Sequence, residues 1–189
     1  METPFAVTPA SDARPISPLW YVFAILVAIA GGVLGILGAV VQELRAGGFL
    51  LLPILGAPII EEALKPTGVY ILLVRWPHVV RSQLFTMFLS ALAGLTFGLV
   101  ESAAYVAAFA DDAPDWFAAY RFTVPVAMHT TASMIVGLAI NRSLLDWAQG
   151  RAPLPKPSRN LYFTAMALHG IFNTVALALS FAGVFDDAS

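Results

Sequence analysis

The chain has 189 residues, of which 59% are hydrophobic and 12% charged, and it contains no cysteine. Soluble domains carry about 25% charged residues, so this composition indicates a polytopic membrane protein. The formal net charge of −2 offers no basic surface for nucleic acid, and the lack of cysteine excludes disulfides, thiolate catalysis and cysteine metal ligands.

Residues 1–18 are rich in proline and polar residues, and we expect them to form a flexible N-terminal tail. Residues 19–185 are expected to form a single transmembrane helical domain. Its apolar runs predict five spans, with approximate bounds 19–43, 49–74, 83–109, 119–147 and 161–182. The predicted fold class is therefore all-α: a polytopic membrane helix bundle with a polar cavity inside the membrane.

Basic residues determine the expected orientation, because they concentrate in cytoplasmic loops. Arg75 and Arg81 lie between the second and third spans. Four more lie between the fourth and fifth, namely Arg142, Arg151, Lys156 and Arg159. We expect both connections on the cytoplasmic side of the cell membrane and the acidic connection 111–115 outside. Five spans then place the N-terminus in the cytoplasm and the C-terminus outside.

Ionisable residues interrupt four of the five apolar runs. They are Glu61 and Glu62 in the second, Glu101 in the third, His129 in the fourth and His169 in the fifth. A charge at the bilayer centre costs about 2.5–3.5 kcal/mol even on a lenient scale, so we expect these side chains to face one another. Counted from the outer ends of their spans, they lie at similar depths, roughly 12–20 Å. A single shared site is the simplest interpretation.

The second span has the most charged cluster. Glu61 and Lys65 are four residues apart and share a helix face, where they can pair, whereas Glu62 points about 100° away. This spacing favours Glu62 as the base that faces the cavity. Pro58 and Pro66 flank the cluster and predict a bent or broken helix. The alternative is that the cluster is only a structural ion pair in a kinked helix.

The third span combines close packing with a carboxylate. Gly94 and Gly98 have the Gly-x-x-x-Gly spacing, which allows a second helix to approach closely. Glu101 follows, and Tyr105 lies one turn further on the same face. We interpret Glu101 as a third carboxylate of the site, with Tyr105 in support. The alternative is a protonated glutamate that hydrogen-bonds across helices.

The last two spans each present a histidine beside a polar residue. His129 and Ser133 lie on one narrow face of small or polar residues in the fourth span. His169 and Asn173 share a face of the fifth, where an imidazole and a carboxamide could stabilise an oxyanion. For each pair the alternative is a structural hydrogen bond between helices.

Taken in order, these motifs resemble a known family. They read Glu-Glu-x-x-Lys, then Phe-Gly-x-x-Glu-x-x-x-Tyr, then Arg with a later His, then His-Gly-x-x-Asn. The set resembles the PrsW-type intramembrane proteases of the CAAX protease and bacteriocin-processing superfamily over about residues 56–175. The wider CAAX protease branch usually has arginine at the position of Pro66, so Pro66 favours the PrsW branch. Ser102 stands where the family often has asparagine.

The resemblance implies hydrolysis of peptide bonds within or beside the membrane. Glu61 and Glu62 match the catalytic glutamate pair of the family. The other matching polar positions are Glu101, His129, His169 and Asn173. Lys65, Tyr105 and Ser133 are expected to support the site. The expected function is thus an intramembrane endopeptidase, a glutamic protease, that acts on a membrane-anchored protein or peptide.

Two mechanisms are open at this point. In the favoured one no cofactor is needed: Glu61 or Glu62 activates water with help from His129, and His169 and Asn173 stabilise the oxyanion. In the other, Glu101, His129 and His169 hold a divalent metal such as zinc, and the glutamate pair is the base. The sequence has neither His-Glu-x-x-His nor Gly-x-Ser-x-Gly.

Two functions without proteolysis compete with this interpretation. A proton- or cation-coupled carrier or channel could use the same carboxylates and histidines as a relay, although the chain is small and shows no paired repeats. A non-catalytic scaffold could bind membrane helices through the Gly-x-x-x-Gly face. Turnover of a peptide separates the protease from both.

Overall fold

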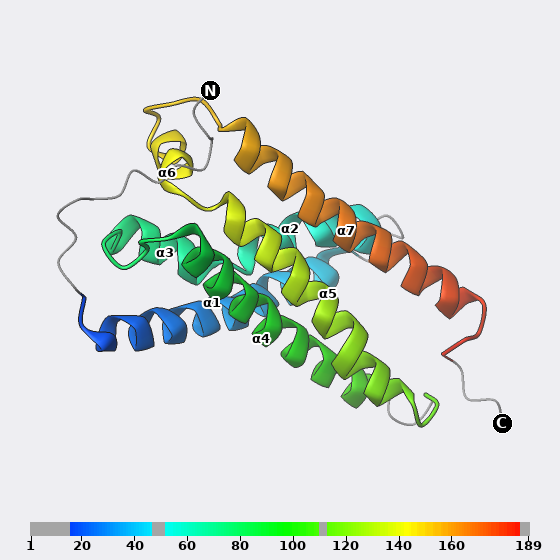
Figure 1. The fold of residues 1–189 in the computed structure, drawn as a ribbon. Helices are drawn as coiled ribbons and strands as arrows, with labels where there is room; N and C mark the ends of the chain where they lie inside the picture. Colours follow the sequence, from blue (N-terminus) through cyan, green and yellow to red (C-terminus); the bar gives the residue numbers. More distant parts are fainter. Residues whose placement is uncertain (1–15, 47–51, 110–112, 186–189) are drawn as a thin grey trace.

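The computed structural model describes residues 16–46, 52–109 and 113–185, and all regular elements in these ranges are helical (Figure 1). In chain order they are α1 (Pro18–Ala46), the π-helix η1 (Leu52–Gly56), α2 (Ala57–Leu64), α3 (Thr67–Arg75), α4 (Gln83–Phe109), α5 (Phe117–Ala139), α6 (Arg142–Ala148) and α7 (Lys156–Phe181). The all-α class expected from the sequence is confirmed. Most of the expected tail, residues 49–51 and two acidic residues, Asp111 and Asp112, lie outside the described residues.

Four of the helices are long and apolar enough to cross a membrane: α1, α4, α5 and α7. They correspond to the first, third, fourth and fifth expected spans, and the third has the same bounds, 83–109, in sequence and structure. The protein is therefore a multi-pass membrane protein.

The second expected span is a broken helix. Within its described part, α2 ends at Leu64 and α3 begins at Thr67, so the helix axis is interrupted at Pro66. Proline has no backbone N–H and its ring excludes the preceding turn, as the sequence indicated. The Thr67 hydroxyl donates to the Leu64 carbonyl at the break, which satisfies one of the carbonyls left free there.

The fourth expected span is shorter than predicted. α5 ends at Ala139, and the residues beyond it form the separate short helix α6. Asn141 begins α6, because its side chain accepts a hydrogen bond from the Leu144 amide at 3.1 Å. An asparagine cap of this kind is a helix start signal, so the expectation of one continuous helix over 119–147 was wrong.

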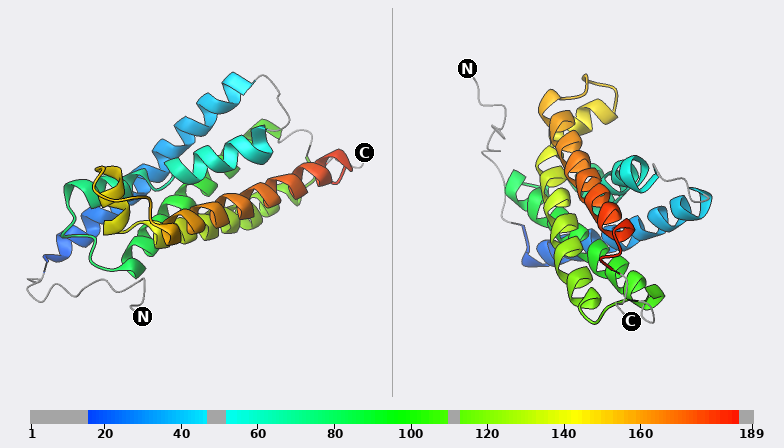
Figure 2. Two further views of the ribbon diagram at one scale, coloured as in Figure 1. Left: turned by 90° about the horizontal axis from the view of Figure 1, so that it is seen from above. Right: turned by 90° about the vertical axis from the view of Figure 1, so that its right-hand side faces the viewer.

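The helices form a ring around a common interior. α4 packs against α1 on one side and α5 on the other, α5 packs against α7, and α7 contacts η1 and α2, which return to α1. Figures 1 and 2 show the broken segment α2–α3 between α1 and α7. The broken helix therefore completes a ring that four continuous helices alone would leave open, and its side chains can reach the interior.

Glycines allow the backbones of this ring to approach closely. A Cβ at Gly94 would lie 2.5 Å from the His129 carbonyl oxygen, and one at Gly98 would lie 3.0 Å from Val126 Cα. A Cβ at Gly68 would lie 2.0 Å from the Val27 carbonyl oxygen, where α3 crosses α1. These contacts leave no room for a side chain, so α4 lies directly against the turn of α5 that carries His129.

A proline in α5 is compensated from the neighbouring helix. Pro125 lies inside α5 and cannot donate to the carbonyl of Arg121, four residues earlier. Ser102 of α4 donates its hydroxyl to that carbonyl at 2.7 Å. In an apolar bundle a backbone carbonyl without a partner is costly, so Ser102 gives the α4–α5 pair a specific register at the position where the family often has asparagine.

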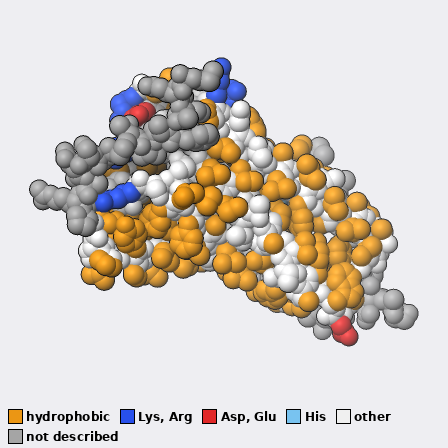
Figure 3. All heavy atoms as spheres, viewed as in Figure 1, with side chains coloured by type: hydrophobic (Ala, Val, Ile, Leu, Met, Phe, Trp, Pro, Cys, Tyr) orange, Lys and Arg blue, Asp and Glu red, His pale blue; other side chains and the backbone are white. Residues whose placement is uncertain are grey.

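The surface fits an apolar surrounding. Hydrophobic side chains cover most of the face in Figure 3, and the basic side chains visible on this face lie toward one end. The α3–α4 connection, α6 and the start of α7 lie at that same end (Figures 1 and 2). The two connections that carry arginine and lysine are therefore on one side of the bundle.

The close contact at Gly94 predicts an effect on stability opposite to the one expected from helix propensity. Replacing glycine by alanine within a helix normally adds about 1 kcal/mol of stability. We expect Gly94→Ala to lower the free energy of unfolding instead, by roughly 1–3 kcal/mol, because the new methyl would overlap the His129 carbonyl. The measurement is thermal unfolding of the purified protein in detergent.

Gly38→Ala is the matched control for this substitution. A Cβ there would meet only the end of the flexible Leu64 side chain, so it should be neutral or stabilising. An unchanged or raised unfolding temperature for Gly94→Ala would contradict the close α4–α5 contact.

Candidate active site

Four elements deliver polar side chains to one place in the interior. The residues are Glu61 and Glu62 of α2, Lys65 directly after α2, Glu101 of α4, His129 of α5 and His169 of α7. All are buried except Glu101, whose side chain keeps 21% of its exposure. The structure thus brings together the five ionisable residues singled out in the sequence. Lys65, which was expected only as support, lies among them.

Lys65 is the centre of the group. Its side chain is fully buried, and its Nζ lies 2.6 Å from Glu62 Oε1, 2.8 Å from His129 Nδ1 and 3.3 Å from Glu61 Oε2. The ammonium also lies 4.3 Å from the centre of the Phe97 ring, a favourable cation–π contact. The sequence paired Lys65 with Glu61 alone. The Glu61–Lys65 pair is present at 3.3 Å, but the sequence did not predict the shorter contact with Glu62 at 2.6 Å.

His129 connects Lys65 to Glu101. An ammonium can only donate, so His129 Nδ1 accepts from Lys65 and its Nε2–H donates to Glu101 Oε2 at 2.9 Å. Arg121 donates to the same Glu101 oxygen at 3.0 Å. The Arg121 guanidinium in turn lies 4.0 Å from the centre of the Tyr105 ring. Tyr105 therefore supports the site through Arg121.

His169 is bound on one side and open on the other. Its Nδ1 lies 2.8 Å from Glu62 Oε1, and its Nε2 faces Glu61 Oε2 at 3.8 Å, beyond hydrogen-bond distance. With Nδ1–H donating to the Glu62 carboxylate, Nε2 carries the lone pair. Ser133 approaches the other Glu62 oxygen at 3.5 Å. Glu62 is therefore an anchor shared by Lys65, His169 and Ser133.

Glu61 is the carboxylate that can still accept a hydrogen bond or bind an ion. Its Oε2 is buried and accepts no hydrogen bond from the described residues, although Lys65 lies at 3.3 Å. A buried oxygen without a hydrogen bond needs an explanation, and a ligand or water there supplies one. The spacing argument had favoured Glu62 for the open position. The geometry instead leaves Glu61 open and Glu62 bound on several sides.

A metal ion would fit the same residues. Glu61, His129 and His169 each offer a ligand atom, and these atoms lie within 4.8 Å of one another. One carboxylate with two imidazoles is a common zinc set in hydrolases. His169 Nδ1 contacts Glu62 and His129 Nε2 contacts Glu101, as the second nitrogens of metal-bound histidines do, although His129 Nδ1 already accepts from Lys65. The metal set expected from the sequence contained Glu101 in place of Glu61.

For three residues the structure adds a position or a contact that the sequence analysis did not predict. Asn173 lies one turn beyond His169 on α7 and is half-buried. Arg121 and Phe97 were quoted in the motifs but given no role, and the structure gives each a contact with the group. An arginine near a membrane span is unusual enough to require a partner, which could have identified Arg121. No comparable pattern marked Phe97.

The fold and the site together define a class of protein. It is a helical multi-pass membrane protein in which three carboxylates, two imidazoles and an ammonium meet in the interior, all of them buried except the partly exposed Glu101. The family model of PrsW intramembrane metalloproteases matches residues 15–185, and the chain belongs to this family. Searches of curated proteins and of solved structures gave no match.

Family membership confirms the resemblance seen in the motifs. It identifies the protein as an intramembrane protease, with a protein as its substrate, and the family is described as metalloproteases. The histidines and Glu61 form a group that can hold an ion, in agreement with that description.

The central position of Lys65 makes a prediction about stability. Lys65→Met keeps the length of the side chain but leaves Glu61 and Glu62 buried without their shared cation. Breaking a buried ion pair on one side costs about 3–5 kcal/mol. We therefore expect a large drop in the unfolding temperature in detergent. Lys156→Met, at an exposed position, is the control and should have little effect. Equal unfolding temperatures for both variants would show that Lys65 does not balance the glutamates.

Proposed function

We propose that this protein is an intramembrane endopeptidase that hydrolyses peptide bonds of membrane-associated proteins, with Glu61, His129 and His169 as the residues that act on the reacting atoms. The observation that carries the proposal is the open Glu61 oxygen beside the open nitrogen of His169, both buried in a PrsW-family chain. Peptide hydrolysis needs groups that accept a proton from water close to groups that stabilise negative charge.

The three carboxylates of the site have different roles in this proposal. Glu62 and Glu101 orient the two histidines by accepting their outward N–H groups, and Glu61 is left for water or an ion. Arg121 and Tyr105 hold Glu101 in place. Because the orienting groups are themselves fixed by several contacts, the reactive nitrogens keep a defined direction, which is what preorganised catalysis requires.

In the absence of an ion, Glu61 is the side chain best placed to accept the proton of an attacking water; as a ligand it would instead help to hold the ion to which that water binds. Lys65 lies 3.3 Å from it and can only donate, so its ammonium is suited to stabilise negative charge that develops on the substrate carbonyl oxygen. The sequence argument gave that role to His169 and Asn173. Asn173 remains a candidate for the same task because it lies one helical turn from His169.

We propose a divalent ion such as zinc as the cofactor, held by Glu61, His129 and His169. Such an ion polarises the carbonyl and lowers the pKa of bound water. His129 offers Nδ1 to the ion only when Lys65 turns away, because Lys65 otherwise occupies that lone pair. The family description as metalloproteases and the open Glu61 oxygen weigh against the cofactor-free mechanism that the sequence favoured.

The proposal includes a membrane orientation. The basic connections lie at one end of the bundle (Figure 1), so we place that end in the cytoplasm of a cell with the protein in its cell membrane. The chain then begins inside and ends outside. Residues 19–185 act as one transmembrane domain, and the substrate is a membrane-anchored protein or peptide.

Replacing Glu61 should affect activity alone, whereas replacing Glu62 should affect both activity and stability. Glu61→Gln removes the open carboxylate and should reduce cleavage at least about 100-fold, with an unfolding temperature close to that of the parent. Glu62→Gln removes the anchor of Lys65 and His169 and should lower both activity and stability. Cleavage is measured on a membrane protein found by comparing membrane proteomes of cells with and without the enzyme.

Asp146→Asn, at an exposed position, is the control for these carboxamide substitutions and should cleave normally. Full activity of both purified glutamine variants would remove the glutamates from the mechanism. Loss of activity in Glu62→Gln alone would exchange the two roles.

Metal dependence should appear both in activity and in composition. Protein stripped with a zinc chelator and dialysed should lose cleavage and regain it with stoichiometric zinc, because the proposed ligand set would be emptied and then refilled. Elemental analysis should find zinc in the parent protein and much less in His169→Ala or Glu61→Ala. Unchanged cleavage by protein shown to contain no divalent metal would return the mechanism to glutamate-activated water.

A further inference from the structure

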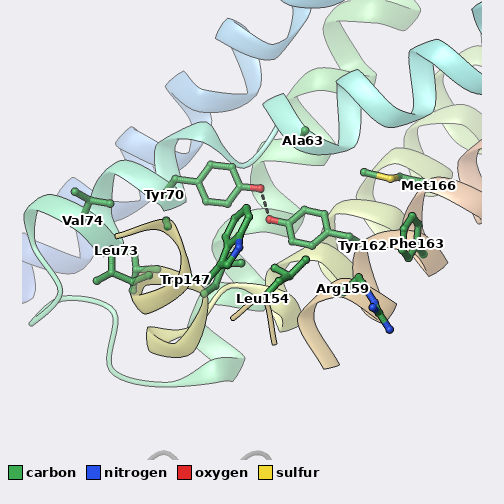
Figure 4. A pocket seen from close by; sticks show the side chains of 13 residues that line it. Ala63, Tyr70, Leu73, Val74, Trp147, Leu154, Arg159, Tyr162, Phe163 and Met166 are labelled. Carbon is green, nitrogen blue, oxygen red and sulfur yellow. Dashed lines mark hydrogen bonds between the residues drawn. The ribbon is translucent and has the colours of Figure 1, made fainter. Parts of the chain in front are cut away.

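An apolar pocket lies apart from the charged group, at the end of the bundle that carries the basic connections. It has a volume of about 490 Å³ and is enclosed by α3, α6 and α7, with Ala63 of α2 at its upper side (Figure 4). Pockets of about 300–1,000 Å³ hold small ligands. Nothing in the proposed proteolysis uses this space.

The side chains that line the pocket favour a hydrocarbon ligand. Leucine, valine, phenylalanine and methionine side chains line it, together with Trp147. Two hydroxyls, those of Tyr70 and Tyr162, hydrogen-bond to each other across it (Figure 4). Because one hydroxyl donates to the other and the rest of the deep lining is apolar, a polar ligand would lose its hydration and gain few partners. An apolar chain gains free energy for each methylene removed from water.

The edge of the pocket adds a positive charge. Arg159 belongs to the lining, is exposed, and forms no ion pair within the described residues. In Figure 4 its guanidinium points away from the tyrosine pair. Arg151, in the preceding connection, is already paired with Asp146. Arg159 is thus the cation of this pocket that is available to an outside anion.

We propose that this pocket binds one acyl chain of an anionic phospholipid, whose phosphate lies against Arg159. A phospholipid supplies both features in one molecule: a hydrocarbon chain for the apolar walls and a negative group at the depth where the chain leaves the bilayer core. The pocket lies beside connections rich in arginine and lysine, which attract anionic headgroups. Trp147 lies in the same lining, as aromatic residues at the membrane interface do.

The deep part of the pocket adjoins the helices of the charged group. Ala63 follows Glu62 in α2, and Met166 lies one turn before His169 in α7. An acyl chain in the pocket would fill the space between these two helices. Bound lipid should therefore stabilise the arrangement of α2 against α7, whether or not the protein cleaves a substrate.

The test compares phospholipids on the purified full-length chain in neutral detergent. We expect phosphatidylglycerol to raise the unfolding temperature and to remain bound in native mass spectrometry, more strongly than phosphatidylcholine with the same chains. Arg159→Gln should weaken phosphatidylglycerol about fivefold and remove the preference between the headgroups. Arg151→Gln, whose guanidinium is paired with Asp146, is the matched control and should keep the preference.

A second measurement places the chain in the pocket. Phosphatidylglycerol with brominated chains should quench the fluorescence of the parent more than that of Trp147→Phe, which keeps Trp20, Trp76 and Trp116. The quenching of Trp147 should be reduced in Ala148→Phe, which narrows the pocket. Equal binding of the two phospholipids with no effect of Arg159→Gln would overturn the proposal. So would equal quenching of the parent and Trp147→Phe, or displacement of the lipid by an apolar membrane peptide, which would make the pocket a site for protein substrates.

Discussion

One buried ammonium determines much of this structure. Lys65 has no exposure and lies within ion-pair distance of both Glu61 and Glu62, so the charges of α2 compensate one another inside an apolar bundle. An uncompensated charge at that depth would be too costly to retain. The compensation has a geometric requirement: His129 and His169 must reach the same point from α5 and α7. The close packing of the helices is therefore a condition for burying the charges.

The breaks in the helices serve the same requirement. Pro66 ends α2 immediately after Lys65, so the charged turn lies at the end of a short helix that is packed between α1 and α7. Gly170, directly after His169, allows the chain before α2 to approach, because a Cβ there would lie 2.8 Å from the Ile54 carbonyl oxygen. A continuous second span with a larger residue at position 170 would separate His169 from the glutamates.

The sequence predicted which side chains would meet but not how they would pair. Charge in apolar runs is a strong constraint, and it identified Glu101, His129 and His169 without any knowledge of packing. Helix spacing could not decide between Glu61 and Glu62, because offsets of three and four residues both bring a carboxylate within reach of a long lysine side chain. The choice depends on His169, which comes from 107 residues further along the chain. The catalytic roles of these residues remain predictions.

The helix ends, too, were predicted from the sequence only in part. Proline is a local signal, and the break at Pro66 was expected from it. The end of α5 was missed because hydropathy continues past Ala139 into α6, and only the capping side chain of Asn141 marks the boundary. The partner of the Arg121 carbonyl could not be predicted either, since Ser102 lies on another helix. Local chemistry thus determined the elements, and contacts between elements determined the details of the site.

A series of contacts connects the buried Lys65 to the partly exposed Glu101. Lys65 and Glu62 are fully buried, His129 keeps 3% of its side-chain exposure, and Glu101 keeps 21% where it meets Arg121. Exposure therefore increases along these contacts, from Lys65 through His129 to Glu101. Because His129 donates to Glu101 and accepts from Lys65, a change of charge at this more accessible end alters the partner of Lys65 directly. The same arrangement that buries the ammonium also connects it, through one imidazole, to the part of the group that is open to its surroundings.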